Sequence, residues 1–554
     1  MRPENNEQSS NSPVSRRRFL GSTAALAATS FALPALAQPA VAPGASQVGP
    51  AVKSFDLDEI SAADLQDGLR SGKFTARSLV EKYLARIAEI DKSGPALNAI
   101  IELNPDALSI ADSLDAERKS GKTRGPLHGI PVLIKDNIGT ADRMSTTAGS
   151  LALAGFTPAQ DSAVARRLRA AGAVILGKTN LSEWANFRSS HSSSGWSGRG
   201  GQTRNPYALD RNPCGSSSGS GAGVSANLCA LSVVSETDGS IVCPSSSNGV
   251  VGIKPTVGLV SRAGIILISH SQDTAGPICR TVADAAALLS ALAGADPGDP
   301  ATADSAGHVE SDYTKFLDPN GLRGARIGIL RKFFDFNEKL GPLLDAALDA
   351  MKREGAVLVD PVEIGTLGKF DDSEFTVLLY EFKADLNAYF ARNPNAPVRS
   401  LAGVIDFNER NASKELSYFG QDIMQKAQAK GPLTEKAYLD ALASNHLLAR
   451  EHGIDSVMNA NRLDALFAPT AGPAWLTDLV DGDHDTGGSS SPAAVAGYPN
   501  INVPAGFIFG LPVGVSFFGR AWSEPTLIRI AYAFEQATQQ RKPPQYLPTA
   551  NLLA

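Results

Sequence analysis

Two Ser/Gly-rich clusters hold the residues with the clearest capacity for chemistry. The first reads PCGSSSGSGAG over residues 213–223, and the second reads SETDGSIVCP over residues 235–244. Glycine permits turns with positive φ, and the successive amides of such turns point into one concavity that suits an anion or an oxyanion. A serine hydroxyl in these turns could attack a carbonyl carbon, but only if a base removes its proton. The chemistry therefore depends on where the base lies.

Histidine is the usual base, but none of the seven histidines falls within the two clusters. His128, His191 and His270 could reach them only through space. Lys135 is a second candidate, because it ends the apolar run at residues 132–134 that predicts a buried strand. Burial lowers the pKa of a lysine by disfavouring the charged form, and only the neutral amine can accept a proton.

Taken in order, these segments resemble the amidase signature family. The resemblance rests on Lys135 in its setting, on GSSSGS at residues 215–220, and on ETDGSI at 236–241 followed by GVVGIKPT at 249–256. Within the family, SGWSGRGGQTRNPY at 194–207 and GLVSRAGI at 258–265 most resemble bacterial peptide amidases, which remove the C-terminal amide of peptides. The likeness covers nearly the whole chain after the N-terminal leader.

The resemblance implies a Ser-Ser-Lys triad that hydrolyses a carboxamide and releases ammonia. In this sequence Ser240 would be the nucleophile that forms the acyl-enzyme, Ser216 the bridging serine that passes the proton, and Lys135 the base. The oxyanion hole would be formed by the backbone amides of Thr237, Asp238, Gly239 and Ser240. The resemblance implies no metal and no cofactor.

Four positions depart from the family pattern. Cys214 and Ser218 stand where many members have glycine beside the first serine pair, and Asp238 stands where glycine is frequent. Val242 replaces a common arginine two positions beyond the nucleophile. These changes keep the three catalytic side chains and bear on the shape of the oxyanion loop.

Other interpretations of the clusters are weaker. GSSSG also fits the G-x-S-x-G elbow of α/β-hydrolases, with Ser217 as nucleophile, but that motif needs a strand directly before it and the preceding RNP segments are turn sequences. A phosphate-binding loop would need a G-K-[ST] ending, which is missing. A cysteine nucleophile at Cys214 or Cys243 has no adjacent histidine.

The first 52 residues predict export and a linker. Residues 1–37 resemble a twin-arginine signal peptide, with SRRRFL at 15–20, a weakly apolar stretch and ALA at 35–37 before Gln38. A single membrane anchor is disfavoured by the short length and the alanine and threonine content of this stretch. Residues 38–52 are rich in Pro, Ala and Gly and predict a flexible linker. We therefore expect an exported protein, periplasmic or secreted, with no stable membrane anchor after processing.

The amino-acid composition limits which classes of binding partner are expected. Residues 1–37 hold four basic and two acidic side chains, so the mature chain carries 47 basic and 55 acidic ones, a net charge of −8. This balance argues against nucleic acid or anionic lipid as the main partner. The resemblance implies a small-molecule or peptide amide substrate instead. The four cysteines lack metal-ligand spacing, and their spacing assigns no disulfide: Cys214, Cys229, Cys243 and Cys279. We expect mostly buried, free thiols.

The fold class follows from repeated helix, glycine and strand units. One unit covers residues 161–176, with a helix capped by Ser162 and a turn at Gly172, and another covers residues 343–359. Such units build a parallel sheet with helices on both faces, and active sites lie outside the strand ends. We expect one α/β domain over residues 53–545, with a large mixed, mostly parallel twisted sheet. Asn180 and Glu183 predict a capping box for the next helix.

The second half of the domain begins with a variable region. Residues 294–459 lack the signature and predict amphipathic helices, including 414–429 and 434–451, that shape the substrate cleft. Strands are predicted at 463–469, within 497–506 and at 511–519, and a closing helix at 524–538. Residues 478–491 predict a surface loop without full calcium-loop spacing.

Three other functions stay open beside a peptide amidase. A broader amidase or acyl-ester hydrolase would act on small or aryl amides. A subunit of a transfer-RNA-dependent amidotransferase shares the signature, but the leader argues against it. An exported binding protein could keep the fold without catalysis.

Overall fold

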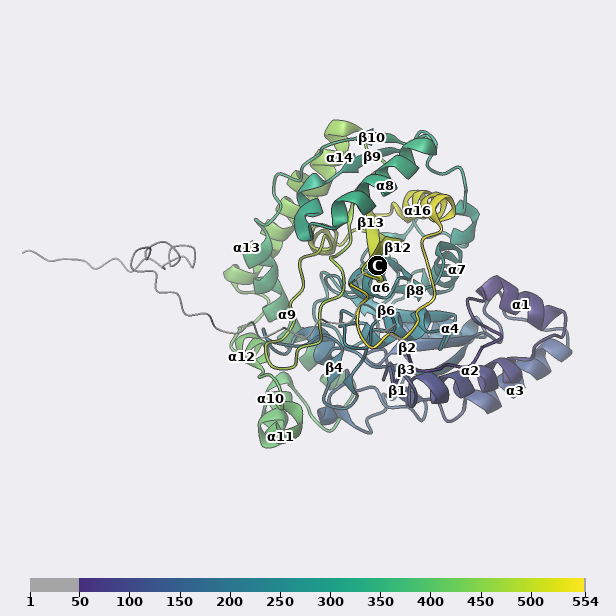
Figure 1. The fold of residues 1–554 in the computed structure, drawn as a ribbon. Helices are drawn as coiled ribbons and strands as arrows, with labels where there is room; N and C mark the ends of the chain where they lie inside the picture. The colour runs from purple at the N-terminus through teal and green to yellow at the C-terminus, as the bar shows by residue number, and fades with distance from the viewer. Residues whose placement is uncertain (1–48, 553–554) are drawn as a thin grey trace, which may run out of the picture. The chain divides into compact units, whose positions relative to one another are not determined.

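A computed structural model describes residues 49–552, all within one compact unit (Figure 1). The predicted leader and most of the predicted linker lie outside the described residues. Eleven strands form one sheet in the order β1-β3-β2-β6-β8-β7-β12-β13-β11-β9-β10. They are β1 (Ile100–Leu103), β2 (Pro131–Lys135), β3 (Val174–Thr179), β6 (Leu231–Glu236), β7 (Val251–Lys254), β8 (Thr274–Cys279), β9 (Arg326–Ile329), β10 (Val357–Val359), β11 (Ala465–Pro469), β12 (Asn500–Ile508) and β13 (Leu511–Phe518). A separate hairpin pairs β4 (Trp196–Ser197) with β5 (Gly201–Gln202).

The large mixed sheet confirms the predicted fold class, but the sheet is not mostly parallel. Four of its ten strand pairings are parallel and six are antiparallel. The parallel pairings occur where helix-containing connections return the chain, at β3-β2-β6 and at β11-β9-β10. The central strands β8, β7, β12 and β13 pair antiparallel because hairpins and loops connect several of them.

Two groups of helices pack on the central strands, as expected for a sheet covered on both faces. Helices α5 and α6 contact each other, while α4, α7, α16 and α8 form a second contiguous group. In Figure 1, α1 to α3 lie with β1 to β3 at one end of the sheet, and α8 lies with β9 and β10 at the other. The α-helices are α1 (Ala62–Arg70), α2 (Ala76–Ile90), α3 (Ala107–Lys119), α4 (Ala163–Ala170), α5 (Ser218–Ser225), α6 (Val242–Ser247), α7 (Val282–Leu292), α8 (Leu340–Arg353), α9 (Asp371–Arg392), α10 (Leu401–Arg410), α11 (Ala412–Glu415), α12 (Asp422–Gln428), α13 (Lys436–His446), α14 (Asp455–Asn461), α15 (Ser491–Ala496) and α16 (Glu524–Thr538). Among residues 49–552, no helix combines the length and the apolar character needed to cross a bilayer.

Strand β2 carries Lys135 to one edge of the sheet. Its residues are all buried between the parallel neighbours β3 and β6, which explains the continuous apolar run in the sequence. Ile134 of β2 pairs with Val233 of β6, so the two strands end at the same edge. Lys135 and the ETDGS segment that follows β6 therefore emerge side by side.

Local capping and turn signals explain several predicted elements. The Ser162 hydroxyl accepts a hydrogen bond from the amide of Ala165 and caps α4, and Gly172 turns the chain with φ +78° before β3. The predicted closing helix matches the bounds of α16, and the strands predicted near 463–469 and 511–519 are β11 and β13.

The capping box predicted from Asn180 and Glu183 is wrong. Residues Glu183–Asn186 form a short 3₁₀ segment in which Trp184 and Ala185 have positive φ. The Glu183 carboxylate pairs with the buried Arg188 guanidinium at 2.7 Å and accepts the amide of Gly198 at 2.6 Å. The Asn180 amide donates to the backbone oxygen of Gly201. Both side chains are used in tertiary contacts and neither caps a helix.

The helix predicted over residues 414–429 is also interrupted. Helix α11 ends at Glu415 and α12 begins at Asp422. Between them, the Phe419 ring lies 4.0 Å from the Arg188 guanidinium and packs edge-on against Trp196. These contacts draw the segment out of helical geometry. By contrast, the helix predicted over 434–451 continues from α13 into a π-helical stretch, η7 (Leu447–Ile454).

Candidate active site

Lys135, Ser216 and Ser240 lie in one hydrogen-bonded chain. Lys135 Nζ donates to Ser216 Oγ at 2.8 Å, and the hydroxyl oxygens of Ser216 and Ser240 are hydrogen-bonded at 3.0 Å. The three residues come from different parts of the fold: the end of β2, the loop before α5, and the loop between β6 and α6. The structure thus brings together the three side chains selected from the sequence. Proton transfer along such a chain is geometrically allowed, because both steps fall within hydrogen-bond distance.

Burial makes the Lys135 amine a candidate base. The side chain is fully buried, and this burial lowers its pKa to about 7, although the negative charges of Asp273 and Glu236 oppose the shift. The amine also donates to the backbone oxygen of Ser235 at 3.0 Å and lies 3.3 Å from the Ser235 hydroxyl. The Ser235 hydroxyl in turn accepts a hydrogen bond from the side-chain amide of Asn137 at 2.8 Å. Near neutral pH a substantial fraction of Lys135 is therefore uncharged and held in place.

The first serine cluster is held by close backbone packing. The backbone oxygen of Ser216 accepts the amide of Ser182 at 3.0 Å. At Gly219, in the first turn of α5, a Cβ would lie 2.2 Å from the backbone oxygen of Ala99. Only glycine permits that approach. The α/β-hydrolase alternative for Ser217 is not supported, because β5 ends at Gln202 and no strand of the described chain directly precedes the cluster.

The loop between β6 and α6 presents free backbone amides beside Ser240. Gly239 has φ +77°, and within residues 49–552 no acceptor hydrogen-bonds the amides of Thr237, Asp238, Gly239 or Ser240. The next two amides, of Ile241 and Val242, donate to the Glu236 carboxylate and so fix the far end of the loop. An anionic oxygen placed at these free amides would find donors that no other acceptor occupies.

The flanks of this loop explain two departures from the family pattern. Asp238 lies outside the set of residues with positive φ, so its backbone does not require glycine, and its carboxylate accepts the Ser490 hydroxyl. Thr237 donates its hydroxyl to Asp273. Val242 begins α6 and is fully buried, where an apolar side chain is favourable.

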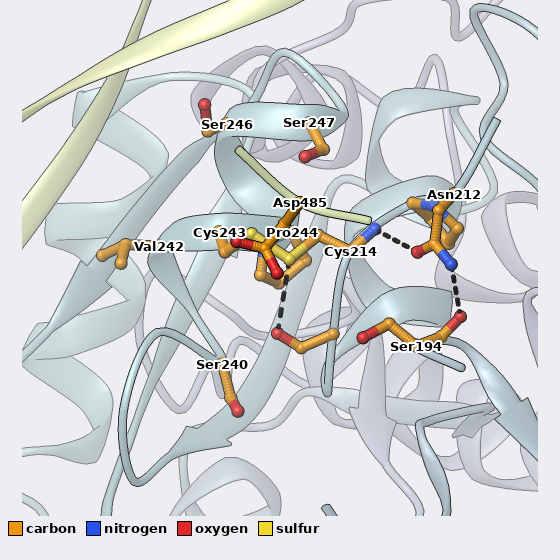
Figure 2. Close-up of a disulfide and its surroundings, with 12 residues drawn as sticks. Ser194, Asn212, Cys214, Ser240, Val242, Cys243, Pro244, Ser246, Ser247 and Asp485 are labelled. Atoms are coloured by element: carbon orange, nitrogen blue, oxygen red, sulfur yellow. Dashed lines mark hydrogen bonds between the residues drawn. A yellow bond between two sulfur atoms is a disulfide. The ribbon is translucent and has the colours of Figure 1, made fainter. Parts of the chain in front are cut away.

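Two of the four cysteines form a disulfide, so the prediction of free thiols is wrong for this pair. Cys214 and Cys243 are bonded, with their Cα atoms 6.0 Å apart, and link the two Ser/Gly clusters (Figure 2). Cys229 and Cys279 are free and buried, as predicted. The pairing also removes a cysteine nucleophile from consideration. Sequence spacing could not reveal the pair, because the link depends on two loops meeting in space.

The three histidines considered from the sequence take no part in this hydrogen-bonded chain. His128 is fully buried, with Nε2 at 3.0 Å from the backbone oxygen of Leu114. His270 Nδ1 lies 3.0 Å from the Asp385 carboxylate, and His191 contacts the neighbouring Ser190. Among residues 49–552, no hydrogen bond joins a histidine to Ser216 or Ser240.

Two groups of side chains have donor atoms of the kind that bind metal ions within 4.8 Å of one another: His270, Glu381 and Asp385, and Asp478, Asp481 and His484. In the first group the Glu381 carboxylate already accepts the hydroxyls of Ser269 and Tyr438. In the second, the Asp478 carboxylate accepts the amides of Val480 and Asp481 and closes a surface turn. The carboxylates of Glu381 and Asp478 are thus already used by the chain itself.

Sequence reasoning missed two residues around the base. Ser235 contacts the amine through both its backbone oxygen and its hydroxyl. Its place directly before ETDGS, at the end of a short apolar stretch, was the available signal. The charge of Asp273, one residue before β8, raises the pKa of Lys135, and nothing in its spacing from the clusters indicates this influence.

The comparisons with known proteins identify the family of this chain. The Amidase family profile matches residues 78–528. A probable amidase of Arabidopsis thaliana is 46% identical over 503 residues, which cover 89% of this chain and 93% of that protein. The native peptide amidase of Stenotrophomonas maltophilia superposes with a TM-score of 0.85 at 55% identity, covering 89% of this chain and 99% of that one. A peptide amidase bound to the competitive inhibitor chymostatin gives a TM-score of 0.87 at 55% identity, covering 88% and 100%. With the family match and these structural neighbours, the chain belongs to the amidase signature family of hydrolases.

Proposed function

We propose that this amidase hydrolyses carboxamides through an acyl-enzyme on Ser240, with Ser216 as the proton relay and Lys135 as the base. The observation that carries the proposal is the unbroken hydrogen-bonded chain from Lys135 Nζ through Ser216 Oγ to Ser240 Oγ. The free amides beside Ser240 support it, because an oxyanion formed at Ser240 needs hydrogen-bond donors of this kind.

Acylation begins with neutral Lys135. The amine takes the Ser216 proton as Ser216 takes the proton of Ser240, and Ser240 Oγ attacks the carbonyl carbon. The resulting oxyanion is stabilised by backbone amides of the Thr237–Ser240 loop. Loss of one such donor typically costs about 100-fold to 1,000-fold in rate. The C–N bond then breaks, and ammonia leaves with the proton that returns from Lys135 through Ser216.

Deacylation repeats the path with water as the nucleophile. Water attacks the ester carbonyl and its proton enters the relay. The ester bond to Ser240 breaks, Ser240 recovers its proton, and the carboxylic acid leaves. The relay ends as it began, with a neutral amine, so each step is balanced within the chain, substrate and water.

The nucleophile can be tested by substitution. Ser240→Ala should lower amide hydrolysis by at least about 10⁴-fold, since no hydroxyl remains to form the acyl-enzyme. A matched control is Ser247→Ala, which removes a buried hydroxyl that has no hydrogen-bond partner. It should keep activity close to the parent protein in the same ammonia-release assay.

Labelling separates catalysis from a binding role. An activated phosphonate should label Ser240 in the parent protein and in the Ser247→Ala protein, as located by peptide mass spectrometry. Undiminished turnover by Ser240→Ala would eliminate the proposed nucleophile. A parent protein that neither labels nor releases ammonia would support a binding protein that has lost catalysis.

The pH dependence of amide hydrolysis should follow the titration of Lys135. Because burial lowers the pKa of Lys135 to about 7, kcat/KM should rise with pH and level off above about 7 as the neutral amine becomes dominant. Asp273→Asn should move the midpoint to lower pH, because the negative charge that favours the protonated amine is removed. Asp349→Asn, at an exposed position on α8, is the control and should leave the midpoint unchanged. A midpoint near 10.5, the ordinary lysine pKa, would contradict a buried neutral base.

We propose peptide C-terminal amides as the substrate class. The support is the 55% identity to peptide amidase over nearly the whole of that chain, together with the peptide-amidase-like segments at 194–207 and 258–265. An ammonia-release panel should show kcat/KM at least about 10-fold higher for amidated dipeptides and tripeptides than for acetamide and an aryl amide. Preference for the aryl or small aliphatic amide would establish the broader amidase instead.

We also propose that the protein works outside the cytoplasm. The twin-arginine leader supports export, and the Cys214–Cys243 disulfide suits an oxidising compartment. A mature chain that begins at Gln38 should be recovered from the periplasmic fraction of an expressing bacterium. Arg16→Lys/Arg17→Lys should leave the precursor in the cytoplasm. Full-length parent protein confined to the cytoplasm would contradict export.

A further inference from the structure

We infer that the Cys214–Cys243 disulfide positions the two serines of the relay relative to each other. This inference rests on the proposed function. Cys214 lies two residues before Ser216, and Cys243 lies three residues after Ser240. The bond therefore joins the loop of the bridging serine to the loop of the nucleophile, and Figure 2 shows it together with Ser240.

Each cysteine is anchored in its own loop. The Cys214 amide donates to Asn212 Oδ1 at 2.9 Å, and its backbone oxygen accepts the Ser218 hydroxyl at 2.6 Å. The Cys243 amide donates to the backbone oxygen of Gly239 at 2.8 Å, which closes the turn that carries Ser240. Because both anchors are firm, the disulfide transmits the position of one loop to the other.

A second contact links the same segments and can preserve the fold. The Asn248 side chain donates to the backbone oxygen of Pro213 at 2.9 Å. This hydrogen bond attaches one residue before Cys214 and beyond the end of α6. Loss of the disulfide should therefore leave the loops in place but free to shift relative to each other.

The backbone at Cys214 supports a role for its side chain. Its φ is +57°, in the left-handed region where glycine is favoured and a side chain is disfavoured. Many family members have glycine beside this serine pair. A cysteine that keeps the glycine-like backbone forms a covalent bond across the site that glycine could not form.

The link matters because the relay tolerates little movement. The Ser216 and Ser240 oxygens are 3.0 Å apart, and a hydrogen bond weakens steeply as its donor and acceptor separate. Misplacement of a catalytic group by 1 Å can cost about 100-fold in rate. We therefore expect kcat to fall by about 10-fold to 100-fold without the disulfide, with little change in KM.

The first test uses substitutions in the full enzyme. Cys214→Gly suits the local backbone and removes the bond, as does Cys243→Ala. The two single variants and the double variant should share one lowered kcat, because each lacks the same bond. The matched control is Cys279→Ala, which keeps the disulfide; Cys279 pairs with Leu231, at the end of β6 away from the site. It should retain parental kcat.

The second test reduces the parent enzyme. Two thiol groups of dithiothreitol are oxidised to its cyclic disulfide, while Cys214 and Cys243 each gain a hydrogen. The partly exposed Cys243 offers a point of attack, and the other two cysteines are buried thiols. Thiol titration in denaturant should count two thiols before reduction and four after. Reduction should lower kcat to the level of the double variant, which should itself be insensitive to dithiothreitol.

Two results would overturn the inference. One is a count of four free thiols in the parent enzyme before reduction. The other is a kcat within twofold of the parent value in a protein that thiol titration shows to lack the disulfide. Loss of circular dichroism on both substitution and reduction would make the bond a structural support and would also overturn a positioning role. Failure of the proposed function is recognised separately, because Ser240→Ala would then retain activity whatever the state of the disulfide.

Discussion

The burial of one amine is the constraint on which this site depends. Lys135 ends a strand that is enclosed between two parallel neighbours, so water cannot stabilise its charge. The resulting fall in pKa to about 7 turns a residue that is ordinarily cationic into a base near neutral pH. Ser216 and Ser235 supply the acceptors that hold the amine in one orientation.

A buried base also needs control of the charges around it. Glu236 is buried beside the nucleophile loop, where its carboxylate accepts two backbone amides and faces the Lys254 ammonium. Lys254 in turn donates to the backbone oxygen of Tyr498. The two backbone amides engage one oxygen of the Glu236 carboxylate within its own loop. The negative charge of the carboxylate raises the pKa of Lys135 and opposes the effect of burial. The amine pKa thus reflects a balance between desolvation and two nearby carboxylates.

The glycine-rich segments position the hydroxyls by close approach. Gly219 lies too near the Ala99 backbone for any side chain, and Gly239 turns the oxyanion loop with positive φ. In the 294–459 region, tertiary contacts override the local sequence pattern. The pattern over 414–429 favours one helix, but the contacts of Phe419 with Arg188 and Trp196 interrupt it. Tertiary contacts prevail there because isolated helix propensity is weak.

Local signals in the sequence determined much of this protein. The apolar run before Lys135, the Ser162 cap, the turn at Gly172 and the closing helix depend on neighbouring residues, as does the choice of Lys135, Ser216 and Ser240 through their motifs. Only the tertiary structure decided which strands pair antiparallel, how Asn180 and Glu183 are used, that Asp273 lies near the base, and that Cys214 bonds to Cys243. The physical reason is the sequence separation of the partners. These contacts join residues far apart in the chain, so they depend on which loops and strand ends meet in the fold.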